Sequence, residues 1–426
     1  MALHFNLHKY QTETQPFPAQ TRAGNVLSVS VRSTLNLRAY IGYMPKGKKH
    51  KEFLEIFIEN REYVFKTFLP PDAAELVCIT AENLEAKNGH LIIDGIGFES
   101  KKLPEGGGEV FLENDSVRIG IRLSWGGGLA SLVCLDKGVE QVFSKKSGRM
   151  EIGAGYSARP GCELFSRDVN LLNNYDTGRL LQQSYYGASK APYKRGSFWG
   201  NLWRYNPVQG GDKFNNPSRL VDFEIGGGGV YVKSRPLEWD KENSCTDSYM
   251  ESRYSLIGRT VRIENRFIDF SNFDHYASGT SDQELPALYV AAPLRKFVYK
   301  KDGKPVARCD LKFWGDIDNA IYQVFTVEDY WSAWVNEDNF GVGLFVPGVS
   351  KHMSGVYAAP DEEKLPADKS NSVNYTAALG QFAIPNLAPV EYECFLHVGG
   401  LKEMQAAFGE LKKTHVNTLL RNLLAV

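Results

Sequence analysis

The sequence has no excess of one charge. Its 426 residues contain 49 Lys and Arg against 50 Asp and Glu, which gives a formal net charge of −1. Proteins that bind nucleic acid or an anionic membrane surface usually carry a basic patch or stripe. No block of like charge dominates this chain, so we predict no nucleic-acid partner.

Cysteine is scarce, and its spacing indicates no metal site. The six cysteines are scattered, without a Cys-x-x-Cys pair. A disulfide framework or a structural zinc site would require a regular or closely spaced set. The sequence also contains no Gly-x-Ser-x-Gly elbow, P-loop or dinucleotide-binding fingerprint. We therefore predict no metal ion and no cofactor.

Long hydrophobic runs are absent as well. No apolar segment approaches the ~20 residues that span a bilayer, and the first residues do not resemble a signal peptide. We expect a soluble chain without membrane insertion. The compartment and the oligomeric state stay open, and a secreted or periplasmic protein is expected if a signal peptide was removed.

Glycine and aromatic residues are abundant instead. The chain has 40 Gly, 24 Phe, 21 Tyr and 7 Trp, a composition typical of antiparallel β-proteins. Alternating apolar and polar residues predict strands, for example over 26–33 and 259–269. One face of the second strand would carry Val261, Ile263, Asn265, Phe267 and Asp269. We predict an all-β fold.

A Pro- and Gly-rich segment at 101–108 predicts a domain boundary. Residues 1–105 would form a small N-terminal β-sandwich that resembles a binding module, with a short helix or a loop at 72–85. Residues 109–426 would form a larger β-domain. Its last segment, 401–424, has apolar residues at helical spacing after Gly399 and Gly400, which predicts a C-terminal amphipathic helix packed on a sheet.

Two segments resemble galactose-mutarotase-like proteins. Asp115-Ser-Val-Arg-Ile-Gly-Ile-Arg-Leu-Ser-Trp-Gly-Gly-Gly-Leu-Ala-Ser-Leu is similar to the first hairpin of that superfamily. Val390-Glu-Tyr-Glu-Cys-Phe-Leu-His-Val-Gly-Gly-Leu-Lys-Glu is similar to its final strand and turn. The resemblance covers about 109–412 and implies a large β-supersandwich. Such domains occur in aldose epimerases, several polysaccharide lyases and the accessory domains of glycoside hydrolases, so the resemblance implies a carbohydrate partner more strongly than any one reaction.

The densest polar cluster lies at 173–186. It combines a carboxylate, a guanidinium, amides and phenols, which is the mixture that a sugar site requires. Its candidate residues are Asn173, Asn174, Asp176, Arg179, Gln182, Gln183, Tyr185 and Tyr186. The structural alternative is an Asp-Thr-Gly turn in which Arg179 pairs with Asp176.

A second cluster at 198–212 again places aromatic residues between amides and charges. Its candidate substrate-binding residues are Trp199, Trp203, Arg204, Asn206 and Gln209. The two tryptophans would be stacking platforms for pyranose rings. The alternative is that they fill the core, since Trp is highly buried on average.

Glu284 and His275 are further candidates. Glu284 precedes Leu-Pro at the entrance of an apolar strand, and His275 and His352 fall in plausible loops, whereas His397 is expected in the core. Aldose epimerases use a His acid and a Glu base. Asp274-His275-Tyr276 resembles their Asn-His motif only loosely, which places an epimerase third.

The leading interpretation is an enzyme that hydrolyses glycosidic bonds in a poly- or oligosaccharide. Hydrolysis requires two carboxyl groups. Asp176 and Glu284 form the preferred pair, with Glu163 and Asp168 in reserve.

The second interpretation is a polysaccharide lyase that acts on uronic acids by β-elimination. Arg179 with Asn173 or Asn174 would neutralise the substrate carboxylate, and Tyr185, Tyr186 or His275 would transfer protons. A non-catalytic carbohydrate-binding or adhesion protein is the alternative from outside the enzymes.

Overall fold

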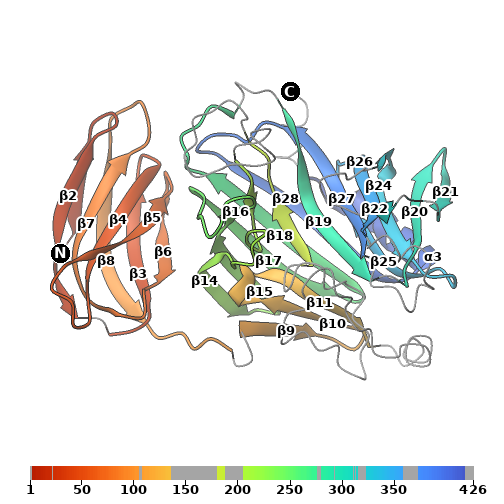
Figure 1. Ribbon diagram of the computed structural model, residues 1–426, viewed down its shortest axis with the longest axis horizontal. Coiled ribbons are helices and arrows are strands. Elements are labelled where there is room, and N and C mark those ends of the chain that lie inside the picture. The colour runs from red at the N-terminus through yellow and green to blue at the C-terminus, as the bar shows by residue number, and fades with distance from the viewer. Residues whose placement is uncertain are drawn as a thin grey trace.

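The computed structural model describes residues 2–21, 23–104, 108–135, 180–187, 205–275, 280–291, 293–309, 311, 313–314, 323–357 and 373–417. These residues form four β-sheets and a C-terminal helix (Figure 1). The strands pair antiparallel except β22 with β26, which are parallel. The predicted all-β fold with a C-terminal helix is therefore confirmed.

The first two sheets lie in the N-terminal sandwich, at the left of Figure 1. One sheet has the order β1 (Leu3–Leu7), β8 (Gly89–Glu99), β3 (Val26–Ser33) and β6 (Glu62–Phe68). The other has the order β2 (Thr12–Thr21), β7 (Ala73–Asn83), β4 (Leu37–Pro45) and β5 (Glu52–Ile58). The expectation of a helix or loop at 72–85 is wrong, because β7 occupies this segment and pairs with both β2 and β4.

The larger part contains a sheet of eleven described strands. Its main path is β22 (Phe313–Trp314), β26 (Lys351–Tyr357), β27 (Val373–Phe382), β19 (Ser281–Ala291), β12 (Leu181–Ser184), β11 (Gly128–Cys134), β10 (Val117–Arg122) and β9 (Glu109–Glu113). The strands off this path are β13 (Pro207–Val208), β16 (Leu237–Glu238) and β23 (Gln323–Thr326). A short 3-10 turn, η1 (Leu123–Trp125), lies between β10 and β11.

The fourth sheet has nine described strands. Its order is β14 (Arg219–Gly226), β15 (Gly229–Arg235), β17 (Ser248–Ile257), β18 (Thr260–Asp269), β28 (Pro389–Gly400), β25 (Phe340–Phe345), β24 (Glu328–Val335), β20 (Lys296–Lys301) and β21 (Lys304–Arg308). Gly227 and Gly228 form the tight β14–β15 turn with positive φ angles of 59° and 76°, which glycine adopts without strain.

The main core lies between the two large sheets. Side chains of β10, β12 and β19 from the first sheet share one buried cluster with side chains of β17, β18 and β28 from the second. The predicted face of 259–269 points into this core, since all five of its residues are buried. Two of the five, Asn265 and Asp269, are polar, and each takes part in a buried hydrogen-bond network described below.

Helix α3 (Leu401–Thr414) packs on the outer face of the nine-stranded sheet. It begins directly after Gly400, as the Gly-Gly pair predicts, and buries Met404 and Phe408. The Phe408 ring stacks on Phe345, with centroids 5.5 Å apart and an interplanar angle of 22°. The amphipathic C-terminal helix is confirmed over these residues.

Replacing Phe408 with Ala is expected to lower the free energy of unfolding by about 3–5 kcal/mol, because it removes a fully buried ring and leaves a cavity. Chemical denaturation followed by circular dichroism measures the loss. Leu411→Ala, at a half-buried position of the same helix, serves as the control and is expected to cost less. Equal losses for both variants would contradict this packing.

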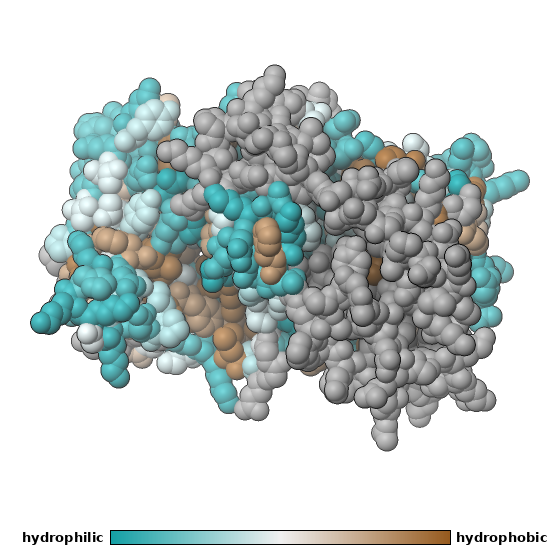
Figure 2. Space-filling model, viewed as in Figure 1, coloured by the Kyte–Doolittle hydropathy of each residue, from teal (hydrophilic) through white to brown (hydrophobic). Residues whose placement is uncertain are grey.

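The N-terminal sandwich is docked on the larger part through apolar and charged contacts. Val221, Tyr249, Ile268 and Phe270 from the larger part belong to the same buried cluster as the interior of the sandwich. Apolar atoms are also visible toward this junction in the space-filling view (Figure 2). The boundary between 105 and 109 remains a prediction.

None of the described helices is long and apolar enough to cross a bilayer.

Candidate active site

Glu284 lies on β19, a central strand of the eleven-stranded sheet. It pairs with Ser184 of β12 on one side and with Leu379 of β27 on the other. The next paired residue of β19 is Ala287, whereas the neighbouring strands advance by only two residues. This extra residue is a β-bulge. Bulges re-aim side chains and are frequent next to active sites.

The Glu284 side chain accepts a hydrogen bond from the hydroxyl group of Tyr375 on β27. Both residues are buried, with exposed fractions of 8% and 2%. They lie on the face of the sheet that points away from the main core, beside a small apolar cluster that includes Tyr289 and Leu379. A carboxyl group and a phenol in hydrogen-bond contact can accept and donate protons, which is what general acid–base catalysis requires.

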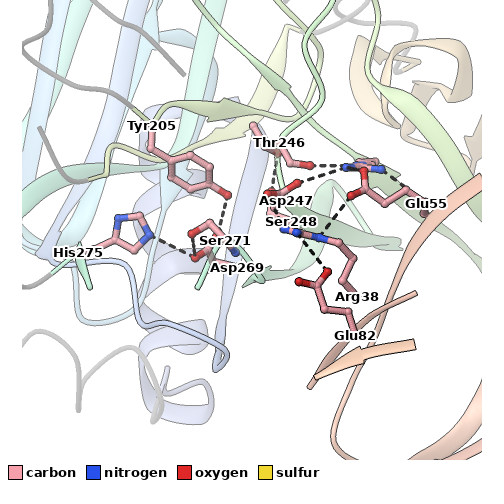
Figure 3. Close-up of polar contacts among 11 residues, drawn as sticks. Arg38, Glu55, Glu82, Tyr205, Thr246, Asp247, Ser248, Asp269, Ser271 and His275 are labelled. Atoms are coloured by element: carbon pink, nitrogen blue, oxygen red, sulfur yellow. Dashed lines mark hydrogen bonds and ion pairs between the residues drawn. The ribbon is translucent and has the colours of Figure 1, made fainter. Parts of the chain in front are cut away.

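A second polar centre lies just beyond the end of β18 (Figure 3). His275 Nε2 is 3.2 Å from Asp269 Oδ2, and both side chains are almost completely buried. Asp269 also accepts hydrogen bonds from the hydroxyl groups of Tyr205 (2.5 Å) and Ser271 (2.6 Å). The Tyr205 ring packs against the imidazole at a centroid distance of 5.2 Å.

This arrangement orients His275. An ionised carboxylate can only accept hydrogen bonds, so the contact with Asp269 selects the imidazole tautomer that carries hydrogen on Nε2. The two hydroxyl donors hold Asp269 itself in place. A histidine fixed in this way by a carboxylate is a common element of acid–base and nucleophilic sites.

Gly187 lies against the other side of His275. A Cβ atom at position 187 would be 2.8 Å from His275 Nδ1 and 2.8 Å from Cδ1 of Tyr205. These distances are shorter than a carbon atom tolerates, so glycine is required by close approach and not by a turn.

Gly187→Ala is therefore expected to push the imidazole off Asp269 and to lower the free energy of unfolding by about 1–3 kcal/mol, the usual cost of overpacking. Equilibrium denaturation in urea measures this loss. Gly226→Ala is the control, because a Cβ there meets no atom within 4 Å. If both alanine variants were as stable as the parent protein, the close approach at Gly187 would be wrong.

Gln283 connects the two centres. It precedes Glu284, and its side-chain amide accepts from the Tyr186 backbone N–H at 2.7 Å and donates to the Tyr186 carbonyl at 3.1 Å. The same amide donates to the Phe382 carbonyl at 2.8 Å. Gly187 then follows Tyr186 and contacts His275. The buried Gln283 side chain thus fixes the backbone of Tyr186, the residue that precedes Gly187, and so links the segment beside His275 to the strand that carries Glu284.

The predicted clusters at 173–186 and 198–212 lie side by side in their described parts. Ser184 of β12 pairs with Val208 of β13, and Gln209 N–H donates to the Gln183 carbonyl at 3.1 Å. Asn206 Nδ2 donates to the Tyr185 carbonyl at 2.7 Å. The described parts of the two clusters are therefore neighbours, through residues 21 to 26 positions apart in the chain.

Three candidate residues in these segments point into the core. Gln183 and Gln209 both donate to the hydroxyl group of Ser252, at 3.2 and 3.0 Å, and that hydroxyl donates to Asn265. Tyr185 donates to Gln183 at 2.9 Å, and burial raises the pKa of Tyr185 well above its usual value. Through these contacts the three side chains bridge the two large sheets.

Gln182 and Asn206 are also held by protein groups. Gln182 Oε1 accepts from Gly210 N–H at 3.1 Å, and the Asn206 backbone N–H donates to Glu238 Oε2 at 2.9 Å. Glu238 is fully buried, and its Oε1 atom has no hydrogen-bond partner in the described structure. Burial, assisted by the charges of Asp247 and Asp269, raises the pKa of Glu238 to about 8.

Other predicted candidates lie outside the described residues. They are Asn173, Asn174, Asp176, Arg179, Trp199, Trp203 and Arg204, together with the reserve residues Glu163 and Asp168. Their roles stay predictions. No group of three or more His, Cys, Asp or Glu within the described ranges is arranged to hold a metal ion.

The expectation that His352 lies in a loop is wrong. It lies within β26 and is completely buried, with Nδ1 2.8 Å from Ser332 Oγ. Burial lowers its pKa to about 3, so it is neutral at physiological pH. His397 is buried on β28 and contacts Thr260 Oγ1 at 2.8 Å, as expected for a core histidine.

Sequence reasoning missed four polar residues of the site, namely Asp269, Tyr205, Tyr375 and Glu238. A signal existed for Asp269, because it is a charged residue on a face otherwise predicted to be core. No local pattern distinguishes Tyr375, whose contact with Glu284 joins residues 91 positions apart. Long-range pairing alone brings these two side chains together.

No protein-family model matches the chain, and no curated protein matches it. Solved structures do show similar folds. One is a 4-alpha-glucanotransferase from Thermococcus litoralis, with 11% identity and a TM-score of 0.38. The match covers 70% of this chain and 39% of that protein.

Two other similar structures come from bacteria. A putative aldose 1-epimerase from Escherichia coli K12 has 9% identity and a TM-score of 0.37, and the match covers 69% of this chain and 99% of that one. A galactose mutarotase related enzyme from Lactobacillus acidophilus has 8% identity and a TM-score of 0.39, with 68% and 97% covered. Similarity at this level assigns no activity.

Proposed function

We propose that this protein is a carbohydrate-active enzyme that cleaves glycosidic bonds by hydrolysis, with Glu284 as one of its two carboxyl groups. The observation that carries the proposal is the position of Glu284. It is a buried carboxyl group on a central strand, placed at a bulge and contacted by the Tyr375 hydroxyl. Burying a carboxyl group is costly for folding, and a buried carboxyl group beside a phenol at a bulge is typical of a site with a chemical role.

Hydrolysis requires a second carboxyl group. Asp176 remains our candidate, since it lies five residues before the start of β12, the strand on which Ser184 pairs with Glu284. A separation of about 5–5.5 Å between the two carboxyl groups would give retention of configuration, and about 6.5–9.5 Å would give inversion.

A polysaccharide lyase is the second candidate, and a specific observation favours it. One partner of Glu284 is a phenol, the Tyr375 side chain, and His275 is oriented by Asp269. A phenol and an imidazole can serve as the acid and the base of β-elimination without a second carboxyl group. In this reading Arg179 would neutralise the uronate carboxylate of the substrate.

A panel of neutral and uronic-acid polysaccharides tests both functions. New reducing ends without ultraviolet absorbance of an unsaturated sugar would identify a hydrolase, and new ends with that absorbance would identify a lyase. Binding measured by calorimetry without any new ends would identify a carbohydrate-binding protein. If no polysaccharide or oligosaccharide in the panel is cleaved or bound, the proposal fails.

A further inference from the structure

We infer that the N-terminal β-sandwich is a positioning element for the Asp269–His275 pair and not an independent binding module. Asp269 is the last residue of β18, and three separate contacts join the backbone around it to the sandwich. Figure 3 shows one of them, the ion pair of Arg38 with Asp247. Asn36, Arg38 and Phe57 of the sandwich are therefore positioning residues. They act on His275 through Asp269 and do not touch it.

The first contact is aromatic. Phe270 follows Asp269 directly, and its ring stacks on Phe57 of β5 with centroids 5.0 Å apart and an interplanar angle of 12°. Both rings are completely buried. Tyr249 completes the contact, because its hydroxyl group accepts the Phe57 backbone N–H at 2.9 Å. The chain cannot move at position 270 without breaking this packing.

The second contact is electrostatic. The Phe270 backbone N–H donates to the Asp247 carbonyl at 2.7 Å. The Asp247 carboxylate accepts from Arg38 of β4 at 3.0 Å, while Arg235 contacts both Asp247 and Glu55 of β5. Arg235 and Asp247 are almost completely buried, and breaking a buried ion pair is strongly destabilising. Asp247, the hydrogen-bond partner of Phe270, therefore contacts β4 directly through Arg38 and is linked to β5 through Arg235.

The third contact holds Asp269 from its carbonyl side. The Asp269 carbonyl accepts the Leu387 backbone N–H at 3.0 Å. The Leu387 carbonyl in turn accepts Asn36 Nδ2 of the sandwich at 3.3 Å. The backbone at Asp269 is therefore held by the sandwich through Phe270 on one side and through Leu387 on the other. A movement of the sandwich would therefore displace the Asp269 carboxylate, which orients the His275 imidazole.

Two matched substitutions separate positioning from ordinary stabilisation. Phe57→Leu removes the stacked ring at the junction but keeps an apolar side chain. Phe5→Leu makes the same change at an equally buried position on β1 of the same sandwich. Both variants are expected to lose stability. Only Phe57→Leu is expected to change the Asp269–His275 pair.

The first readout is the nitrogen-15 NMR spectrum of the histidine side chains in the full-length protein. The His275 signals are assigned with a His275→Gln variant. In the parent protein and in Phe5→Leu, His275 is expected to show the tautomer with hydrogen on Nε2. In Phe57→Leu its two nitrogen shifts are expected to move toward a mixture of tautomers. A global loss of stability does not change the tautomer in molecules that remain folded.

The second readout is turnover, which rests on the second proposed function, the polysaccharide lyase, in which His275 transfers a proton. Because small misplacements of a reacting group cost about 10²-fold, Phe57→Leu is expected to lower kcat by about 10- to 100-fold with little change in KM. Phe5→Leu is expected to leave kcat per folded molecule unchanged. If no glycan is cleaved, the proposed function fails, whereas the NMR result still decides this inference.

Arg38→Gln provides an independent route if Phe57→Leu does not fold. It removes the ion pair with Asp247, and Arg32→Gln is its control, since Arg32 pairs with Asp94 on the exposed surface of the same sandwich. Arg38→Gln is expected to shift the His275 signals, and Arg32→Gln is not. Unchanged His275 tautomer signals in every folded junction variant would overturn the inference.

Discussion

Glu284→Gln is expected to lower kcat on the glycan identified by the substrate panel by about 10²–10⁴-fold, the usual contribution of a general acid or base. Glutamine keeps the shape of the side chain and an oxygen that can accept the Tyr375 hydroxyl. The change in the free energy of unfolding should therefore be small. Initial rates combined with a thermal melt of the same preparation separate the two effects.

Asp282→Asn is the matched control for this prediction. Asp282 lies two residues away on β19, but it is 37% exposed and pairs with Lys351 at 2.7 Å. Surface ion pairs contribute about 0–1 kcal/mol, so this variant should keep both its activity and its stability. If Glu284→Gln retained full turnover, or lost activity only in proportion to its unfolded fraction, Glu284 would be a structural residue.

Glu238→Gln is expected to stabilise the protein at high pH. The pKa of the buried Glu238 is raised from 4.5 to about 8, so the folded state holds a proton that the unfolded state releases. The parent protein therefore loses stability as the pH rises from about 4.5 to about 8, by roughly 5 kcal/mol from this group. Above that range the carboxyl group is ionised in both states, and its contribution is constant.

Urea denaturation of both proteins between pH 5 and 9 measures this difference. The gain in Glu238→Gln should be near zero at the acidic end and largest near pH 9, because glutamine cannot ionise. Glu242→Gln, at an exposed position four residues along, is the control and should follow the parent protein. A constant offset between Glu238→Gln and the parent at every pH would rule out the buried proton.

Local sequence patterns carried much of the fold. The period of two at 259–269 identified β18 and the face that enters the core, because side chains alternate along a strand. The helical spacing after Gly399 and Gly400 identified α3 for the same kind of reason. The strands before and after the Pro- and Gly-rich segment at 101–108 belong to different sheets, and the domain boundary itself stays a prediction.

Sequence patterns failed to predict strands correctly where buried and exposed residues do not simply alternate. The segment 72–85 was expected to form a helix or loop, yet it is the central strand β7, with neighbours on both sides. The apolar run at 287–299 has the pattern of a single strand. It is the end of β19 and the start of β20, which belong to different sheets. The β-propensity of one segment does not predict which strand that segment will pair with.

The sequence by itself determined that this is an all-β chain with a C-terminal helix, and it offered Glu284 and His275 as candidate site residues. Only the tertiary structure decided which groups accompany them. Tyr375 reaches Glu284 from another strand, and Asp269 orients His275 from a position that read as core. The tertiary structure also places the side chains of Gln183, Tyr185 and Gln209 in the core between the two large sheets. The physical reason is that a strand's periodicity fixes which side chains share a face, whereas the register with distant strands fixes what each face meets.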